Sequence, residues 1–168
     1  MVFFSNGRGG GEQVDHGYKG KGSTSHLLVE KSGKPLAITS TAASGDERKQ
    51  VSPLLNKISG LIKKVWNQGK VPILEADKGY DSLDTRIDVL SHKVFPLIPR
   101  RKNTKEYKRQ GTCYLEKQRW VVERTISWLK TSFRRLTVRW ERKAKYWNGF
   151  LTLGLIGYWV NYLSRWMY

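Results

Sequence analysis

The sequence predicts an α/β fold with strands of mixed direction, and three observations support that prediction. Two extended runs rich in β-forming residues, 23–30 and 36–42, flank a turn at 32–35 and indicate a hairpin. A helical pattern over 46–66 is followed by a short apolar run at 71–76, which is the order of elements in a βαβ unit. Two further helical patterns occupy the C-terminal third, so we expect helices flanking a mixed sheet.

The N-terminal region differs in composition from the rest of the chain. Residues 5–22 contain seven glycines and several basic residues. Because glycine destabilises both helices and strands, we expect residues 1–22 to be a glycine-rich loop.

The first helical pattern is amphipathic. From Val51 to Val65 the apolar residues follow one another at spacings of 3, 1, 3, 3, 1 and 3 residues, which places them on one face of a single helix. We expect Asp46 to cap this helix and the chain to leave it between Trp66 and Gly69. The elements expected after it are a buried strand at 71–76, a turn at 77–82, a short helix at 82–91, a strand at 93–99, a basic loop at 100–112, a helix at 115–133 and a last helix at 143–166.

The last helix contains a long uncharged run. Residues 146–164 are 19 residues without a charged side chain, which is long enough to span a bilayer. Asn148, Asn161 and three glycines make the run only weakly hydrophobic. We therefore favour a C-terminal packing helix over the alternative of a small basic membrane protein anchored by this segment, and we expect no contact with membranes.

The composition indicates a nucleic-acid partner. Lys and Arg number 31 against 14 Asp and Glu, for a formal net charge of +17. Such a charge favours binding to a polyanion, although a merely solvated basic surface is the alternative.

The single cysteine, Cys113, excludes a disulfide framework and a cysteine zinc site, so we expect a cytoplasmic protein. The length of 168 residues suggests one domain spanning 1–168.

Two acidic residues are candidates for a site. Asp77 follows the apolar run at 71–76, at the kind of strand end where α/β folds place their sites. A turn aspartate that bonds its own backbone explains Asp77 equally well. Glu123 lies in the long helix, and a step of about 100° per residue puts Arg119, Glu123 and Lys130 on one face beside the apolar stripe. An Arg119–Glu123 surface ion pair, contributing about 0.3–0.5 kcal/mol, is the simpler interpretation from these residues alone.

Arginine and tryptophan alternate along residues 119–142. Arginine suits phosphate contacts, whereas we expect Trp120 and Trp128 to pack inside the protein. The arginines for which we predict contact with the DNA backbone are Arg134, Arg135, Arg139 and Arg142.

Six segments, taken in their order along the chain, resemble segments of the DDE transposases of insertion sequences. They are HGYKGKG (16–22), HLLVEKSGKPLAIT (26–39), ASGDERKQV (43–51), ADKGYDS (76–82), IPRRKN (98–103) and RWVVERTISWLK (119–130). The resemblance implies an RNase-H-like fold, and two divalent ions, Mg²⁺ or Mn²⁺, held by two Asp and one Glu. It assigns Asp77 and Glu123 as catalytic acids and metal ligands. Arg119 and Lys130, which match the spacing of the family's helix signature, would bind a terminal phosphate of the DNA.

The same resemblance implies a reaction and its partners. The family hydrolyses the 3′ phosphodiester at element ends and joins the freed 3′-OH to target DNA, and two copies are expected because two ends must be brought together. The further residues that we expect to bind DNA are Lys19, Lys21, Arg100 and Arg101.

Two positions depart from the family pattern. Glu116 stands where the helix signature has Tyr, and residues 1–4, which match the first strand, contain no Asp. We therefore expect an incomplete first strand in an N-terminally truncated chain: a fragment, a frameshifted product or a pseudogene. Two metal ions need several carboxylates, so we expect the chain alone to be inactive. The alternative function is a non-catalytic, basic DNA-binding remnant.

Overall fold

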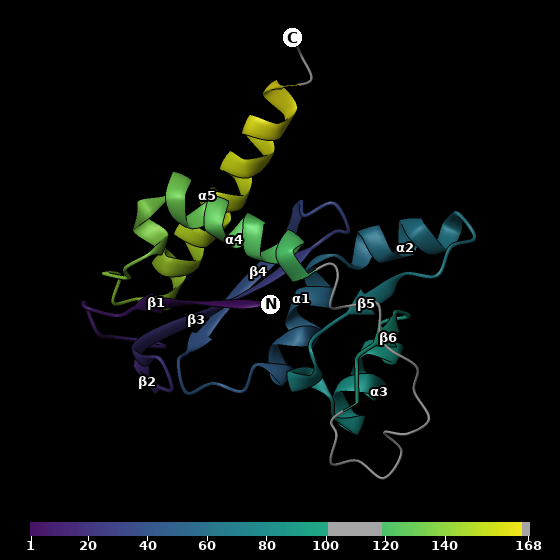
Figure 1. Cartoon of the computed structure of the whole chain (residues 1–168), viewed down its shortest axis with the longest axis horizontal. Coiled ribbons are helices and arrows are strands. Elements are labelled where there is room, and N and C mark those ends of the chain that lie inside the picture. Colours follow the sequence, from purple (N-terminus) through teal and green to yellow (C-terminus); the bar gives the residue numbers. More distant parts are fainter. Residues whose placement is uncertain (101–118, 166–168) are drawn as a thin grey trace. The chain divides into compact units, whose positions relative to one another are not determined.

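The computed structural model describes residues 1–100 and 119–165, and Figure 1 shows its elements. The chain divides into two compact units. Unit 1 combines Met1–Gly45 with the chain from Trp120 onward, and unit 2 is Asp46–Arg119. Each unit is considered by itself below.

Unit 1 contains a four-stranded antiparallel sheet made of β1 (Val2–Asn6), β2 (Asp15–Gly17), β3 (Gly20–Val29) and β4 (Pro35–Ala42). The long strand β3 is central and pairs with the other three. Gly22 pairs with Asn6 of β1 and with Asp15 of β2, so these two strands lie on opposite edges of β3. The part of β3 that pairs with β1 on one edge also pairs with β4, so β4 must lie on the other edge. This is the edge that β2 occupies. The predicted hairpin is therefore confirmed as β3 and β4.

We predicted that the whole glycine-rich region is a loop, and this prediction is wrong for part of it. Strand β2 and the first residues of β3 form a short hairpin within it, with Tyr18 and Lys19 at the tip. The backbone ladder needs no side chains, and Gly20, with φ +107°, supplies the left-handed conformation that closes the turn.

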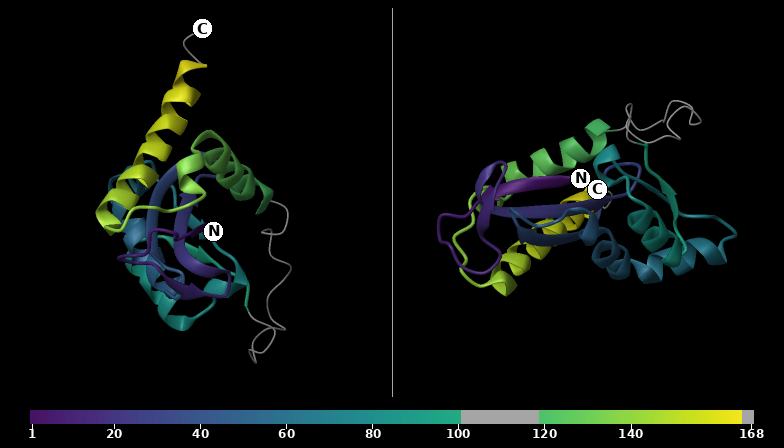
Figure 2. Two further views of the ribbon diagram at one scale, coloured as in Figure 1. Left: turned by 90° about the vertical axis from the view of Figure 1, so that its left-hand side faces the viewer. Right: turned by 90° about the horizontal axis from the view of Figure 1, so that it is seen from below.

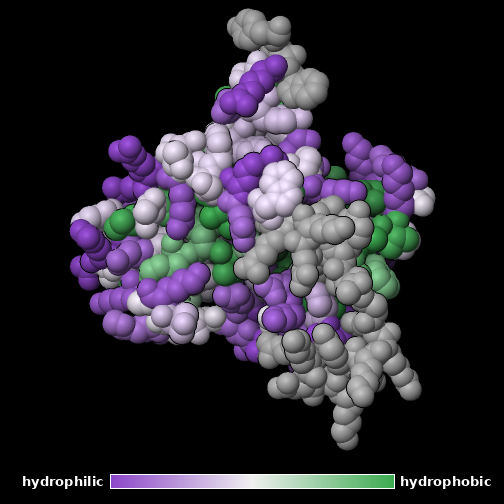
Figure 3. Space-filling view, in the orientation of Figure 1, coloured by the Kyte–Doolittle hydropathy of each residue, from purple (hydrophilic) through white to green (hydrophobic). Residues whose placement is uncertain are grey.

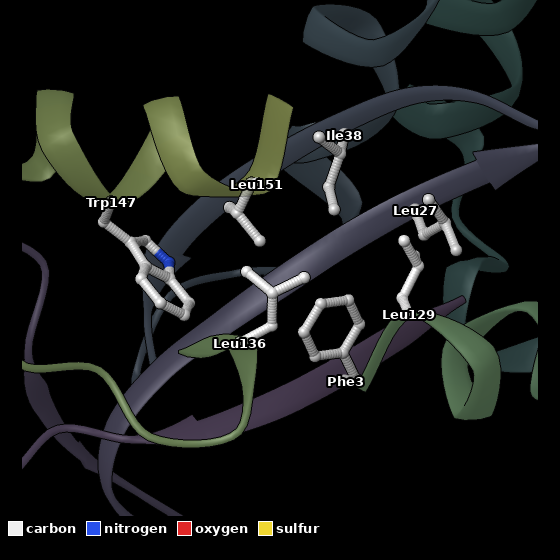
Figure 4. Packing of buried hydrophobic residues seen from close by; sticks show 7 residues of the cluster. All are labelled: Phe3, Leu27, Ile38, Leu129, Leu136, Trp147 and Leu151. Atoms are coloured by element: carbon white, nitrogen blue, oxygen red, sulfur yellow. The ribbon is translucent and has the colours of Figure 1, made fainter. Parts of the chain in front are cut away.

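One face of this sheet is covered by α4 (Arg119–Ser132) and α5 (Ala144–Ser164), which are joined through the short 3₁₀ turn η5 (Arg134–Leu136). Figure 2 shows α4 running along β1, and α5 packs against β4. The core between helices and sheet, shown in Figure 4, consists of Phe3, Leu27, Ile38, Leu129, Leu136, Trp147 and Leu151.

Helix α5 agrees with the predicted packing helix in extent, but only one of its faces is buried. Trp147, Leu151 and Gly154 are buried. The large apolar residues left exposed on α5 are Tyr146, Phe150, Leu153, Ile156, Val160 and Leu163. Within the described residues, none of the helices combines the length and the apolar character needed to cross a bilayer.

Unit 2 contains η1 (Arg48–Gln50), α1 (Val51–Lys57), α2 (Ser59–Asn67), β5 (Ile73–Glu75), η2 (Lys78–Tyr80), α3 (Leu83–Ser91) and β6 (Phe95–Leu97). The βαβ unit is not formed by the helical pattern at 46–66, where we expected it; instead strands β5 and β6 pair in parallel and α3 connects them, so the unit is β5–α3–β6. Together with the antiparallel sheet of unit 1, this confirms the predicted α/β class with strands of mixed direction, and it is consistent with an RNase-H-like fold.

Two details of unit 2 differ from the sequence prediction. The single helix expected over 46–66 is two helices, because Ile58 (φ −111°, ψ 16°) breaks the helical geometry just before Ser59 and the poor helix former Gly60. Strand β5 is not buried as expected, since Ile73 is 59% exposed. It belongs to a sheet of only two strands in the described part of the chain, which covers less of its surface than a larger sheet would.

Candidate functional site

Asp77 lies two residues beyond β5, at the carboxyl end of a parallel strand. Its side chain is exposed and caps η2, with Oδ1 accepting a hydrogen bond from the Gly79 N–H at 3.3 Å. The backbone-capping interpretation is therefore confirmed. It does not exclude the second interpretation, because a cap also fixes the direction in which the carboxylate points.

Residues that follow Asp77 anchor this turn to the rest of unit 2. Asp81 forms an ion pair with Arg86 at 2.9 Å, and both side chains are largely buried. Arg86 also donates to the backbone oxygen of Ile98 at 2.6 Å, just beyond β6. Burial raises the pKa of the Tyr80 hydroxyl, and the nearby carboxylates of Glu47 and Asp77 raise it further. The turn that carries Asp77 is thus fixed by buried polar contacts.

Arg86 was not among the residues that the sequence indicated. Asp81 and Arg86 are five residues apart, which is not a spacing that pairs side chains on one helix. Only the three-dimensional structure brings the two charges together.

On α4 the predicted apolar stripe is confirmed where side chains are described, and Trp128 packs against the core as expected. The prediction that Trp120 packs inside the protein is wrong, since it is 55% exposed and lies beside the Arg124 guanidinium. Leu129 is fully buried, and Ile126 and Phe133 pack partly buried against the core. Glu123 is exposed, and Lys130 is half-buried. The backbone of α4 begins at Arg119, whose side chain lies outside the described part of the structure.

Lys130 is held against the first strand. Its Nζ donates to the backbone oxygen of Phe4 at 3.0 Å and lies 5.4 Å from the centroid of the Phe3 ring. Burial lowers the pKa of this amine, and the positive charge of Lys19 lowers it further. A partly desolvated ammonium interacts more strongly with an anion than one in bulk water.

The direction of α4 relates Glu123 to the same strand. The N-terminal half of α4 contacts the turn after β3, where the Thr125 hydroxyl donates to the Gly33 oxygen at 2.6 Å. Since β3 is antiparallel to β1, that turn lies at the end of the sheet where β1 begins. Glu123 precedes Lys130 by two helical turns, about 10 Å, and so lies toward the start of β1.

Two comparisons place the chain among known proteins. Residues 4–159 match the family model described as "Transposase DDE domain". The chain is also 35% identical, over 134 residues, to a Burkholderia cepacia protein described as a transposase for the insertion sequence element IS402. The chain belongs to the DDE transposases of insertion sequences. The match covers 79% of this chain and 60% of that relative, and no solved structure matches significantly.

In this transposase the two acids of the predicted site belong to different units, Asp77 to unit 2 and Glu123 to unit 1. Strand β1 contains no acid, and no group of three His, Cys, Asp or Glu side chains able to hold a metal ion occurs among the described residues. The carboxylate oxygens of Asp77 and Glu123 are of the kind that Mg²⁺ prefers, and a pair of divalent ions would need further carboxylates.

Glu12 and Asp15 are the acids that follow β1 most closely in the sequence. Asp15 does not lie beside this first strand. It is in β2, on the opposite edge of β3 from β1. Its carboxylate accepts hydrogen bonds from the Ser44 hydroxyl at 2.6 Å and from the His16 N–H at 2.7 Å. These bonds, Ser44 first, lower the pKa of Asp15. It is part of the β2–β3 hairpin and not a replacement for an acid on β1.

The basic residues predicted to bind DNA fall into different settings. Lys19 and Lys21 are exposed on the β2–β3 hairpin, and Arg134 is exposed in η5. Arg135 is exposed but ion-paired with Glu141 at 2.8 Å. Arg100 is half-buried, and Arg101 lies outside the described residues.

The prediction for Arg139 is wrong. Its side chain is fully buried and donates to the backbone oxygens of Glu12, Gln13 and Glu141 and to the Ser23 hydroxyl. Burial lowers the pKa of the guanidinium, an effect that Glu141 and Glu12 oppose. Arg139 holds the chain together and cannot reach DNA, whereas its neighbour Arg142 is exposed.

Proposed function

We propose that this chain forms the catalytic part of a transposase that cuts DNA at the ends of its insertion sequence and joins the freed 3′-OH to target DNA. The supporting observation is the position of Lys130, seven residues after Glu123, against the strand to which the family resemblance assigns another acid. In this half-buried position the ammonium is less well solvated than in bulk water, which strengthens its attraction to an anion such as a phosphate.

In this proposal the chain's own groups have separate roles. Asp77 and Glu123 are the acids that would hold Mg²⁺ or Mn²⁺. When bound, such an ion would offset negative charge on the phosphodiester. Lys130 and Arg119 would bind a phosphate of the element end, and the exposed lysines of the hairpin would hold the DNA backbone.

Strand β1 as it stands supplies no carboxylate, so we propose that these 168 residues have little cleavage activity by themselves. The test is cleavage of DNA carrying element ends in the presence of Mg²⁺ or Mn²⁺. A version of the protein with an aspartate at the start of β1 should cleave, and Asp77→Ala or Glu123→Ala in that version should abolish cleavage. Asp84→Ala, an exposed acid on α3, is the matched control and should leave cleavage unchanged. Robust cleavage by the unaltered chain would refute the proposed inactivity.

The second candidate function is a DNA-binding protein without catalysis. The net charge of +17 supports it, since charge alone gives salt-sensitive DNA binding. The two functions differ in their dependence on the acids. If the aspartate-bearing version binds element-end DNA without cleaving it, and Asp77→Ala and Glu123→Ala leave that binding unchanged, the non-catalytic function is the correct one.

We further propose that the active form pairs two copies, because two DNA ends must be held at once. The exposed apolar face of α5 supports this, since it carries six large apolar residues and the helix has one charged residue, Lys145. Sedimentation of the wild type and of Leu153→Glu would test it. An unchanged sedimentation coefficient for the variant would exclude α5 as the contact surface.

A further inference from the structure

The tip of the β2–β3 hairpin carries the most exposed large hydrophobic side chain of the described residues. Tyr18 has a relative exposure of 105%, whereas the other exposed aromatic residues range from 37% to 56%. It makes no hydrogen bond, ion pair or ring contact within the described part of the chain. A tyrosine ring left wholly in water contributes nothing to the core and is open to a ligand.

The base of the hairpin is fixed while its tip projects. The Asp15 carboxylate accepts from the Ser44 hydroxyl at 2.6 Å and from the His16 N–H at 2.7 Å. A Cβ at Gly17 would lie 2.3 Å from the backbone oxygen of Ala43, so the strand sits directly on that segment. Tyr18 is therefore presented from a rigid base, which reduces the conformational entropy lost when it binds a ligand.

Tyr18 is surrounded by basic side chains and lies on a narrow two-stranded ribbon. Lys19 and Lys21 are exposed beside it, and His16, which pairs with Lys21, is exposed as well. Glycines at 17, 20 and 22 leave the two strands without bulky side chains. Figure 3 shows hydrophilic side chains gathered around this end of the sheet, at the left of the view. A two-stranded ribbon of this kind fits a DNA groove, with ammonium groups positioned for phosphates.

We propose that Tyr18 stacks on an unpaired nucleobase of the DNA that the hairpin lysines hold. The proposal rests on the proposed DNA function and adds a contact to it. Every nucleobase has a flat π face, so stacking on an aromatic side chain requires no particular sequence. A protein partner is a poorer match, because Tyr18 is the sole large apolar side chain in residues 15–22 and an apolar docking surface needs several.

The experiment uses the whole chain and two duplexes of equal length that contain 2-aminopurine. In one duplex the probe base is paired, and in the other it is bulged out. We expect the wild type to bind the bulged duplex about tenfold more tightly than the paired one and to quench its fluorescence. Tyr18→Ala should lose both the preference and the quenching, and Tyr18→Phe should keep both.

Two control variants separate stacking from charge and from general effects. Lys21→Ala should weaken binding to both duplexes by the same factor. Phe95→Ala removes another exposed aromatic residue, on β6, and should retain the preference. All four substitutions are at exposed positions, so each variant should fold.

Different outcomes overturn different statements. If the wild type binds both duplexes equally, or if Tyr18→Ala keeps the preference, the stacking inference fails and salt-sensitive DNA binding still stands. If the wild type binds neither duplex, the proposed DNA function fails, and the inference fails with it.

Discussion

The glycine-rich region of unit 1 consists of two halves that are alike in composition and opposite in structural role. The first, residues 7–14, contains four glycines and is here called the docked half. Its backbone lies against residues 139–142, with the Glu12 N–H donating to the Arg142 oxygen at 2.8 Å. The second, residues 15–22, contains three glycines and forms the projecting half, the β2–β3 hairpin.

The comparison shows that glycine serves two purposes here, close contact between two backbone segments and a left-handed turn. In the docked half the missing Cβ lets one backbone touch another, since a Cβ at Gly9 would lie 2.2 Å from the Trp140 oxygen. In the projecting half Gly20 closes the turn at the tip, whereas Gly17 and Gly22 at its base also lie close to backbone, where a Cβ would be 2.3 Å from the Ala43 oxygen and 2.2 Å from the Ser5 oxygen. The docked half and this base are part of the fold, whereas the exposed tip is available to a ligand. Four predictions test this contrast.

The largest effect is expected at Arg139, which fastens the docked half. Arg139→Met removes the donor for four acceptors, on Glu12, Gln13, Ser23 and Glu141. Because unsatisfied buried polar groups cost about 1–3 kcal/mol each, we expect the free energy of unfolding to fall by about 4 kcal/mol. Urea unfolding measures this, with the exposed Arg142→Met as control. Equal midpoints for the two variants would mean that Arg139 does not fasten the docked half.

The second effect compares two histidines by their response to acid. Burial, and secondarily the positive N-terminal amine, lowers the pKa of His26 in β3 from 6.5 to about 4. Its Nδ1 is buried without a hydrogen-bond partner among the described residues, which also disfavours the doubly protonated ring. The unfolded chain therefore binds the proton more tightly than the folded one between these two pKa values.

The sign of the pH dependence follows from this difference. The contribution of neutral His26 to stability is complete above pH 6.5 and is lost as the pH falls to about 4, a change of up to about 3 kcal/mol. Unfolding of the wild type and of His26→Gln, followed across this range, should show a shallower pH dependence for the variant. His16→Gln, in the exposed projecting half, should behave as the wild type. A steep pH dependence that persists in His26→Gln would assign the effect to another group.

The third prediction separates two reasons for a glycine, namely close contact with another backbone segment and a left-handed conformation. Gly11 has φ +100°, and a Cβ there would lie 2.3 Å from the Arg142 oxygen, whereas Gly10 (φ +61°) and Gly20 (φ +107°) face open space. We expect Gly11→Ala to lower stability by about 2 kcal/mol, and Gly10→Ala and Gly20→Ala to lower it by about 1 kcal/mol, the cost of the left-handed conformation alone. Thermal unfolding would decide, and equal losses at all three positions would show that the docked backbone has room to move.

The same region marks the limit of what the sequence could predict. Periodicity and turn signals identified the β3–β4 hairpin, the short helix α3 and the extent of α5, since each is determined by nearby residues. The roles of the glycines are determined by residues about 130 positions away, such as Trp140 and Arg142, and no local pattern records those contacts.

The site residues show the same division. The face of α4 that carries Glu123 and Lys130 followed from helical geometry, but the bond from Lys130 to Phe4 joins residues 126 positions apart. Arg139 was misassigned because alternation of arginine and tryptophan is equally compatible with a buried and an exposed side chain. Tyr18 was missed because full exposure at a hairpin tip depends on a hairpin that the glycines appeared to exclude.

The smallest effect on stability is expected at Lys19, at the tip of the projecting half. The side chain is exposed, so Lys19→Ala should change the free energy of unfolding by less than about 0.5 kcal/mol. If Lys19 contacts a phosphate, the same variant should lower the slope of log K against log salt by about one in magnitude, because one fewer counterion is released. Titrations of a duplex at several salt concentrations measure the slope, and Lys57→Ala, an exposed lysine of unit 2, is the control. A Lys19 variant with the wild-type slope would show that the projecting half does not contact the DNA backbone, and the contrast between the two halves would then concern folding alone.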